Sequence, residues 1–151
     1  MTDNTCFLLG GGPSLEGFNY SLLDGKITIG VNKTFKYYNP TMLYCMDRRF
    51  FLYIHSDTSQ KINGDEHLLE EWHACPSKKF FIASSTASNN TSKFFKGEEI
   101  TIVPRLSNKC ISMDIKRGIY PGNNSGFGAL MLAVALGYKK IYLLGYDFKI
   151  N

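Results

Sequence analysis

Glycine and small polar residues follow or precede the apolar runs of this sequence, and these residue types suit the binding of an anion. Gly10-Gly11-Gly12-Pro13-Ser14 follows the apolar residues 6–9, and Asn123-Asn124-Ser125-Gly126 precedes the apolar stretch 127–136. Backbone N–H groups of a glycine turn and of a helix start favour a negatively charged ligand, most often phosphate. Glycine also lets the backbone approach a ligand closely, because it has no Cβ. Both segments are therefore candidates for a phosphate site.

Three more polar residues follow apolar runs that read as strands. Asn32 follows residues 27–31, Asp47 follows residues 42–46, and Asp147 comes shortly after residues 140–144. Ligands of a parallel α/β sheet bind at the carboxyl ends of its strands, so we expect these residues to meet at one edge. Each has a structural alternative: Asn32 as a turn cap, Asp47 as the N-cap of a following helix, and Asp147 as the start of a turn.

The glycine run matches neither of the two common phosphate-binding motifs. It has no Gly-Lys-Ser/Thr ending, and Leu15 stands where GxGxxG requires its third glycine. A tight turn without a ligand therefore remains an alternative for residues 10–14, and Asn124 or Ser125 is expected to cap the next helix in any case.

Apolar runs alternate with helical segments along the chain, which indicates an α/β sheet that is mostly parallel. The predicted strands are residues 6–9, 27–31, 42–46, 80–83, 99–103 and 140–144. The predicted helices are residues 15–23, as a short and irregular helix, and residues 48–56, 65–74 and 127–136. The last helix is apolar nearly all round, so it should be buried against the sheet, and Gly137 should end it. Residues 84–93, rich in Ser, Thr and Asn, are predicted to form an exposed loop.

Length, composition and charge predict one soluble domain over residues 1–151. The 151 residues are 44% apolar, and one domain takes roughly 100–200 residues. The longest apolar run, residues 129–136, is far shorter than the roughly 18–20 residues that span a bilayer. No basic segment precedes the first apolar run, so we expect no secretory signal and a cytoplasmic protein. The net charge of +4 comes from scattered basic residues, which argues against a nucleic-acid partner.

The cysteines and histidines show no metal-binding pattern. The four cysteines are far apart, and Cys6 and Cys45 lie in predicted strands as small apolar side chains. Reduced thiols are expected in the cytoplasm. His67, His73 and Cys75 lack the spacing of zinc ligands, so no metal site is predicted.

The middle of the chain is rich in aromatic residues, which either form a subunit interface of a homo-oligomer or are buried in the core. These residues are Phe50, Phe51, Tyr53, Phe80, Phe81, Phe94 and Phe95.

Two blocks resemble one protein family. The run GGGPSLEGFNYSLLDGKITIGVNKTF is similar to the opening of the bacterial sialyltransferases of glycosyltransferase family 42, which have a GPSL turn, an aromatic YS-L segment and a strand ending in an Asn pair. The run NNSGFGALMLAVALGYKKIYLLGYDF resembles the family's Ser-Gly helix, ALGYK-IY strand and Gly-x-Asp-Phe turn. Both blocks are also similar to motility accessory factors and to archaeal 6-hydroxymethylpterin diphosphokinase-like domains. They cover about a third of the chain.

The resemblance implies a Rossmann-like domain that holds a CMP-sugar. It implies phosphate contacts from Gly12, Pro13 and Ser14, a nucleotide contact from Asn32, and a position near the donor sugar for the start of the last helix. Together with the strand ends, the candidate nucleotide- and phosphate-binding residues are Gly10, Gly11, Gly12, Pro13, Ser14, Asn32, Lys33, Asp47, Asn124, Ser125 and Gly126.

The chain departs from the family pattern where catalysis is concerned. Gly11 replaces an Asn of the family's first turn, and Lys149 replaces a Tyr that assists the leaving phosphate. The family's second Tyr and its His base would lie beyond Asn151, so we expect a chain truncated at its C-terminus relative to the family, or a minimal binding domain. Asp147 and Lys149 are the candidate catalytic residues, with Lys149 neutralising charge on the leaving phosphate.

Three functions agree with these residues. The first is a nucleotide-sugar-binding, glycosyltransferase-like domain with the donor phosphate at residues 10–14. The second is a pterin or nucleotide diphosphokinase-like enzyme whose Mg²⁺ is held by Asp47 or Asp147. The third is a catalytically inactive binding domain of the same fold.

Overall fold

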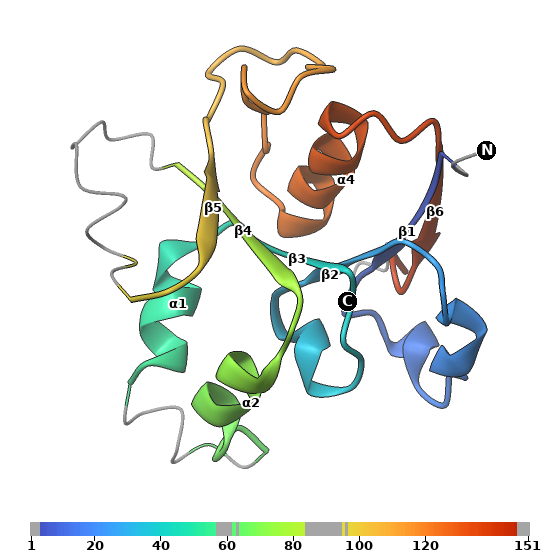
Figure 1. Ribbon diagram of the computed structural model, residues 1–151, viewed down its shortest axis with the longest axis vertical. Coiled ribbons are helices and arrows are strands. Elements are labelled where there is room, and N and C mark those ends of the chain that lie inside the picture. The colour runs from blue at the N-terminus through green and yellow to red at the C-terminus, as the bar shows by residue number, and fades with distance from the viewer. Residues whose placement is uncertain (1–3, 57–61, 63, 84–94, 96, 148–151) are drawn as a thin grey trace.

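The protein is built on a six-stranded sheet in which every neighbouring pair of strands is parallel. The computed structural model describes residues 4–56, 62, 64–83, 95 and 97–147 (Figure 1). The strands are β1 (Thr5–Leu9), β2 (Thr28–Val31), β3 (Met42–Cys45), β4 (Lys78–Ile82), β5 (Ile100–Val103) and β6 (Lys140–Leu144). The prediction of a parallel, Rossmann-like α/β sheet is confirmed.

The order of the strands places a crevice beside β1. The sheet runs β5-β4-β3-β2-β1-β6, so the chain moves outward from β1 to β5 and then returns to the other side of β1. At the carboxyl end of β1, Leu9 pairs with Gly30 of β2 and with Leu144 of β6. A reversal of this kind in the strand order opens a ligand crevice at the carboxyl ends of the strands beside it.

Helices cover both faces of the sheet (Figure 1). Helix α4 (Ser125–Ala135) lies on one face, and α1 (Arg48–Ile54) and α2 (Leu68–Ala74) lie on the other. Side chains of β3 alternate between two apolar clusters: Met42 and Tyr44 pack with α4, whereas Leu43 and Cys45 pack with α1 and α2. Burial on both faces explains why the strands read as continuous apolar runs without polar alternation.

The aromatic middle of the chain supplies much of the core. Phe51, Phe80, Phe81 and Phe95 are buried, and Phe50 and Tyr53 pack partly buried against the α1–α2 cluster. Phe94 lies outside the described residues. Core burial therefore accounts for these side chains.

The short, irregular helix predicted over residues 15–23 is not one continuous element. Two short 3₁₀ helices, η1 (Pro13–Leu15) and η2 (Tyr20–Leu23), stand in its place. Gly17 between them has a φ of +71°, which breaks helical geometry, and the Asn19 side chain accepts the Ser21 N–H at 3.2 Å and starts η2 afresh. Residues 32–36 form a third 3₁₀ helix, η3 (Asn32–Lys36), which is not among the predicted elements.

The remaining predicted elements are present with shifted ends. Helices α1 and α2 are shorter than predicted, and β4 begins earlier. Gly137 has a φ of +90° just after α4, as its predicted role requires. The predicted loop at residues 84–93 lies outside the described residues.

Among the residues that the structure describes, no helix combines the length and the apolar character needed to cross a membrane.

All four cysteines are free thiols, and Cys6, Cys45 and Cys75 are buried. Burial raises the pKa of the Cys6 thiol to about 12, so it stays protonated and unreactive.

Candidate active site

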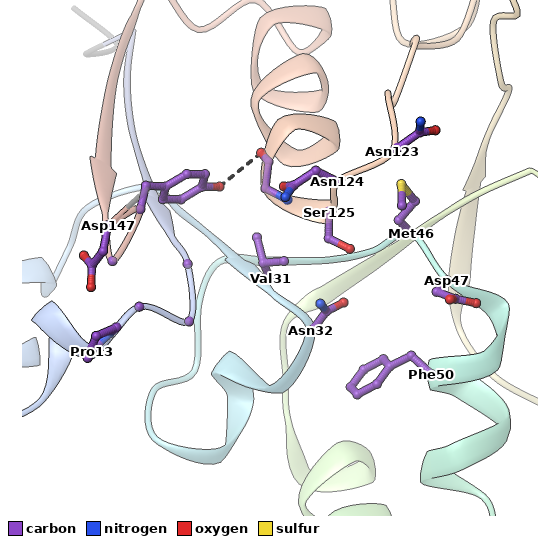
Figure 2. Close-up of a pocket in the computed structure, with 16 residues that line it drawn as sticks. Pro13, Val31, Asn32, Met46, Asp47, Phe50, Asn123, Asn124, Ser125 and Asp147 are labelled. Atoms are coloured by element: carbon purple, nitrogen blue, oxygen red, sulfur yellow. Dashed lines mark hydrogen bonds between the residues drawn. The ribbon is translucent and has the colours of Figure 1, made fainter. Parts of the chain in front are cut away.

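A cavity of about 780 Å³ lies at the carboxyl ends of β1, β2, β3 and β6 (Figure 2). It brings together segments from both ends of the chain. The predicted site residues that line it are Gly10, Gly11, Gly12, Pro13, Asn32, Asp47, Asn124, Ser125, Gly126 and Asp147. Its other lining residues are Val31, Met46, Phe50, Asn123, Gly145 and Tyr146.

The glycine turn is bound to the segment that follows β6. Gly10 N–H donates to the carbonyl of Leu144 at 2.8 Å, and Gly12 N–H donates to the carbonyl of Gly145 at 2.9 Å. Asp147 receives two hydrogen bonds from Ser14, one from its N–H at 2.9 Å and one from its hydroxyl. These N–H groups therefore hold the turn in place and are not available to an anion.

Glycine is needed at this turn because two stretches of backbone approach closely. A Cβ on Gly12 would lie 2.6 Å from Asp147 Oδ2 and 2.6 Å from the carbonyl oxygen of Gly145. A Cβ on Gly11 would meet nothing within 4 Å. Gly12 is thus required by packing, whereas Gly11 borders open space that a ligand can occupy.

The first turn of α4 is capped by Asn124. Its side-chain oxygen accepts the N–H groups of Gly126 at 2.8 Å and of Phe127 at 3.2 Å. Tyr146 packs on the same turn, and its hydroxyl donates to the carbonyl of Gly126 at 3.2 Å. Because Asn124 is the cap, the hydroxyl of Ser125 is not used for that purpose and lines the cavity.

Asn32 has an unusual backbone conformation at the end of β2. Its φ of +52° is the one left-handed value among the described residues other than glycine. Asparagine tolerates this region better than most residues, and such values cluster at binding sites. Next to it, Thr34 Oγ1 accepts the N–H of Val31 at 3.0 Å and stabilises the bend. In Figure 2, Asn32 lies on the opposite side of the cavity from α4.

Asp47 both caps α1 and borders the cavity. Its carboxylate accepts the Arg49 N–H at 2.7 Å and pairs with the Arg49 guanidinium, where Nη2 lies 2.7 Å from Oδ2. The hydrogen bonds from Arg49 hold the pKa of Asp47 below its usual range. The alternative in which Asp47 is a helix N-cap is therefore observed, together with its position at the cavity.

Two predicted residues do not line the cavity, and a third lies outside the described residues. Ser14 is directed to Asp147. Lys33 pairs with Asp65, and its Nζ lies 5.1 Å from the centre of the Tyr53 ring. Lys149 lies outside the described residues.

Sequence reasoning missed the apolar walls of the cavity. Val31, Met46, Phe50 and Tyr146 line it, although each reads in the sequence as an ordinary core residue. Their positions beside the strand-end residues Asn32, Asp47 and Asp147 are the only sequence signal that separates them from other apolar side chains.

Comparison with known proteins adds no relative: no family model, no curated protein and no solved structure matches the chain. Functional inference therefore depends on the geometry of the cavity and on the two sequence blocks.

Proposed function

We propose that this domain binds a nucleotide-sugar in the cavity at the carboxyl edge of the sheet and is glycosyltransferase-like. The observation that carries the proposal is the convergence of the glycine turn, Asn32, Asp47, the start of α4 and the segment after β6 on one cavity of about 780 Å³. The cavity lies beside β1 and β6, where doubly wound sheets hold nucleotides. Its volume falls in the range of about 300–1,000 Å³ that small-molecule sites occupy.

The lining chemistry favours a ligand with little negative charge and many hydroxyl or amide groups. Asn32, Asn123 and Ser125 offer neutral donors and acceptors, and Phe50 and Tyr146 offer flat apolar surface. No Lys or Arg is among the described lining residues, and two carboxylates are. A CMP-sugar is the favoured donor because the two sequence blocks resemble the bacterial sialyltransferases, which use a CMP-sugar.

In this proposal the phosphate lies between Gly11 and Ser125. Gly11 carries the one N–H of the glycine turn for which the described residues show no hydrogen-bond acceptor, and it borders open space. The Ser125 hydroxyl lies at the start of α4, where the helix dipole favours an anion. The phosphate site is thus narrower than the five-residue cradle expected from the sequence.

The magnesium-dependent alternative has weaker support. Asp47 and Asp147 both line the cavity, but Figure 2 shows them on opposite sides of it. Asp47 is paired with Arg49, and Asp147 holds Ser14. Each carboxylate is therefore already engaged by a protein partner, which weakens either one as the ligand of Mg²⁺. An inactive binding domain would bind the same ligand and differ from the favoured function only in having no turnover. We place the protein in the cytoplasm under each of these functions.

The test is isothermal titration calorimetry of the full chain with CMP, a CMP-sugar, a UDP-sugar and a GDP-sugar. We expect saturable binding of CMP compounds and weaker binding of the diphosphate sugars. Asn32→Gly removes the side-chain amide while keeping a residue that accepts positive φ, and it should weaken binding by about tenfold, or about 1.4 kcal/mol. Asn108→Gly, at an exposed position away from the cavity, is the matched control.

No binding of any of these compounds at millimolar concentration would reject the proposal. Magnesium-dependent consumption of ATP would favour the diphosphokinase alternative. Release of free CMP from the CMP-sugar would establish turnover, and tight binding without release would identify a binding domain.

A further inference from the structure

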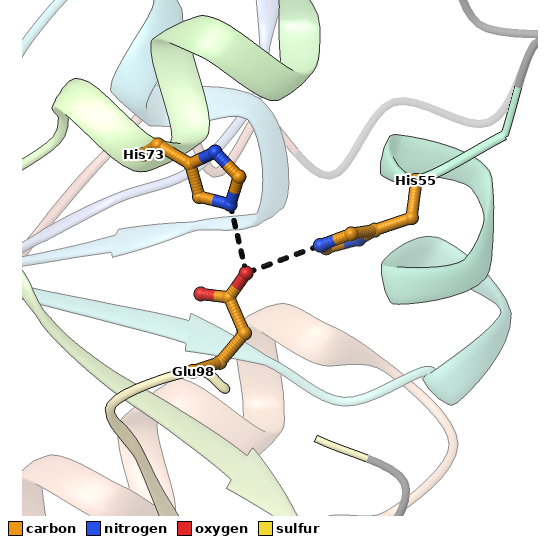
Figure 3. A group of neighbouring side chains, drawn as sticks. All are labelled: His55, His73 and Glu98. Carbon is orange, nitrogen blue, oxygen red and sulfur yellow. Dashed lines mark hydrogen bonds and ion pairs between the residues drawn. The ribbon is translucent and has the colours of Figure 1, made fainter. Parts of the chain in front are cut away.

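A second group of chemically capable side chains lies where the end of α1, helix α2 and the segment before β5 meet (Figure 3). His55 follows the last turn of α1, His73 belongs to α2, and Glu98 precedes β5. Oε1 of Glu98 lies 3.1 Å from Nε2 of His55 and 2.9 Å from Nε2 of His73. One donor atom from each residue lies within 4.8 Å of the other two. Three segments far apart in the sequence thus direct ligand atoms at one point.

The hydrogen bond on the far side of the His55 ring fixes its tautomer. Nδ1 of His55 lies 2.9 Å from the carbonyl oxygen of Phe51, which can only accept, so Nδ1 carries a proton. In the neutral ring, Nε2 then presents a lone pair to the carboxylate of Glu98. Two lone pairs at this distance repel unless a cation lies between them or the ring is protonated. A histidine whose Nδ1–H binds a backbone carbonyl is the usual arrangement of a metal ligand.

The carboxylate is oriented in the same way. The indole Nε1–H of Trp72 donates to Oε2 of Glu98 at 3.2 Å, which leaves Oε1 directed at both imidazoles. Trp72 is fully buried, so this donor has a fixed position. Outer hydrogen bonds of this kind hold metal ligands in place before the ion arrives.

Two of the three separations between the donor atoms match those around a small divalent ion, and the third is at most 4.8 Å. Zinc bonds of about 2.0–2.1 Å in tetrahedral geometry place neighbouring ligand atoms about 3.3 Å apart. The two distances of 3.1 and 2.9 Å to Oε1 are close to this value. Two imidazoles and one carboxylate form a known zinc ligand set that leaves the fourth position open. His73 and Glu98 also line a hollow of about 730 Å³, which gives that position access to solvent.

We propose that His55, His73 and Glu98 bind one divalent transition-metal ion, with Zn²⁺ as the preferred ion. The site is separate from the nucleotide cavity: Asp47 starts α1 at the cavity, and seven helical residues, about 10 Å, separate it from His55. The ion ties the end of α1 to α2 and to the segment that precedes β5. This inference does not depend on the proposed nucleotide-sugar function.

The test is titration of the metal-stripped full chain with Zn²⁺ and with Co²⁺ alone. Trp72 is the single tryptophan of the protein and contacts Glu98, so its fluorescence should respond to both ions. We expect one equivalent of metal per chain, and intense visible Co²⁺ bands typical of four-coordinate nitrogen and oxygen ligands. His73→Ala and Glu98→Gln should each weaken binding by at least about tenfold.

His67→Ala is the matched control, because His67 is 74% exposed next to α2 and pairs only with Glu70 among the described residues. It should leave the affinity unchanged. Glu98→Gln keeps an acceptor for Trp72, so its circular dichroism should match that of the parent.

Three results would overturn the proposal. One is no saturable binding up to about 1 mM metal, which would leave the cluster as an ion pair of protonated histidine and carboxylate. Another is affinity that survives in both His73→Ala and Glu98→Gln. The third is strong near-ultraviolet thiolate-to-cobalt absorption, which would place the ion on a cysteine such as Cys110.

Discussion

The same substitution should have different effects at the two adjacent glycines of the turn after β1: it should lower stability at Gly12 and ligand affinity at Gly11. In Gly12→Ala the new Cβ meets Asp147 Oδ2 and the Gly145 carbonyl oxygen, each at 2.6 Å. One of these atoms is backbone and the other is held by Ser14, so neither moves without breaking hydrogen bonds. Overpacking of this kind costs about 1–3 kcal/mol. At about 2–4 °C per kcal/mol for a chain of this size, Gly12→Ala should lower Tm by about 2–12 °C.

Gly11→Ala should leave the fold intact and act on the ligand. Its Cβ meets no protein atom within 4 Å, and Gly11 is not among the glycines with positive φ. We therefore expect the free energy of unfolding to change by less than about 1 kcal/mol. If the phosphate lies against the turn, the methyl group fills its space, and the affinity for the CMP-sugar should fall by about tenfold.

The assays are thermal unfolding followed by circular dichroism, and calorimetric titration of both variants with the same CMP compound. A wild-type Tm for Gly12→Ala would show that the turn does not pack on the segment after β6. If Gly11→Ala bound the CMP compound with wild-type affinity, the phosphate would not lie against the turn, even though the ligand could still bind elsewhere in the cavity.

Two further substitutions test the rest of the fold. Burial raises the pKa of Asp65, but hydrogen bonds from Lys33, Lys36 and Tyr53 outweigh it and hold the pKa well below its usual range. Its stabilising effect is therefore complete above a pH of about 4 and is lost as the pH falls through the lowered pKa. Tm measured from neutral to acid pH should fall less steeply in Asp65→Asn, which should also be destabilised at neutral pH by about 1–3 kcal/mol; an unchanged acid slope would contradict this. Tyr44→Phe should raise stability by up to about 1 kcal/mol, because the Tyr44 hydroxyl is buried without a hydrogen-bond partner among the described residues; a fall in Tm of several degrees would contradict it.

Local sequence rules were sufficient for the sheet and for the longest helix. Continuous apolar runs identified the strands because burial on both faces of a parallel sheet removes the polar alternation. Helix α4 was found from the residues before and after it, since Asn124 caps its start and Gly137 ends it with positive φ. At residues 15–23 the prediction missed the turn signals of Gly17 and Asn19, which divide the predicted helix into two short ones.

Most of the candidate site was also predictable, because strand ends of a parallel sheet share one edge. Asn32 and Asp147 follow strands, and the topology alone brings them to the same cavity. The electrostatic details were not predictable. Asp147 uses the amide and hydroxyl of Ser14, so the turn binds protein where an anion had been expected.

Local patterns in the sequence are enough to predict the alternation of buried strands with helices and the positions where polar residues follow the strands. These features are local: each depends on a run of a few residues and its neighbours. Which polar groups are already paired depends on how distant segments come together in the fold, as in the hydrogen bond from Gly12 to Gly145. The same holds for His55, His73 and Glu98, whose separation along the chain carries no motif, because their meeting point is set by how α1 and α2 pack on the sheet.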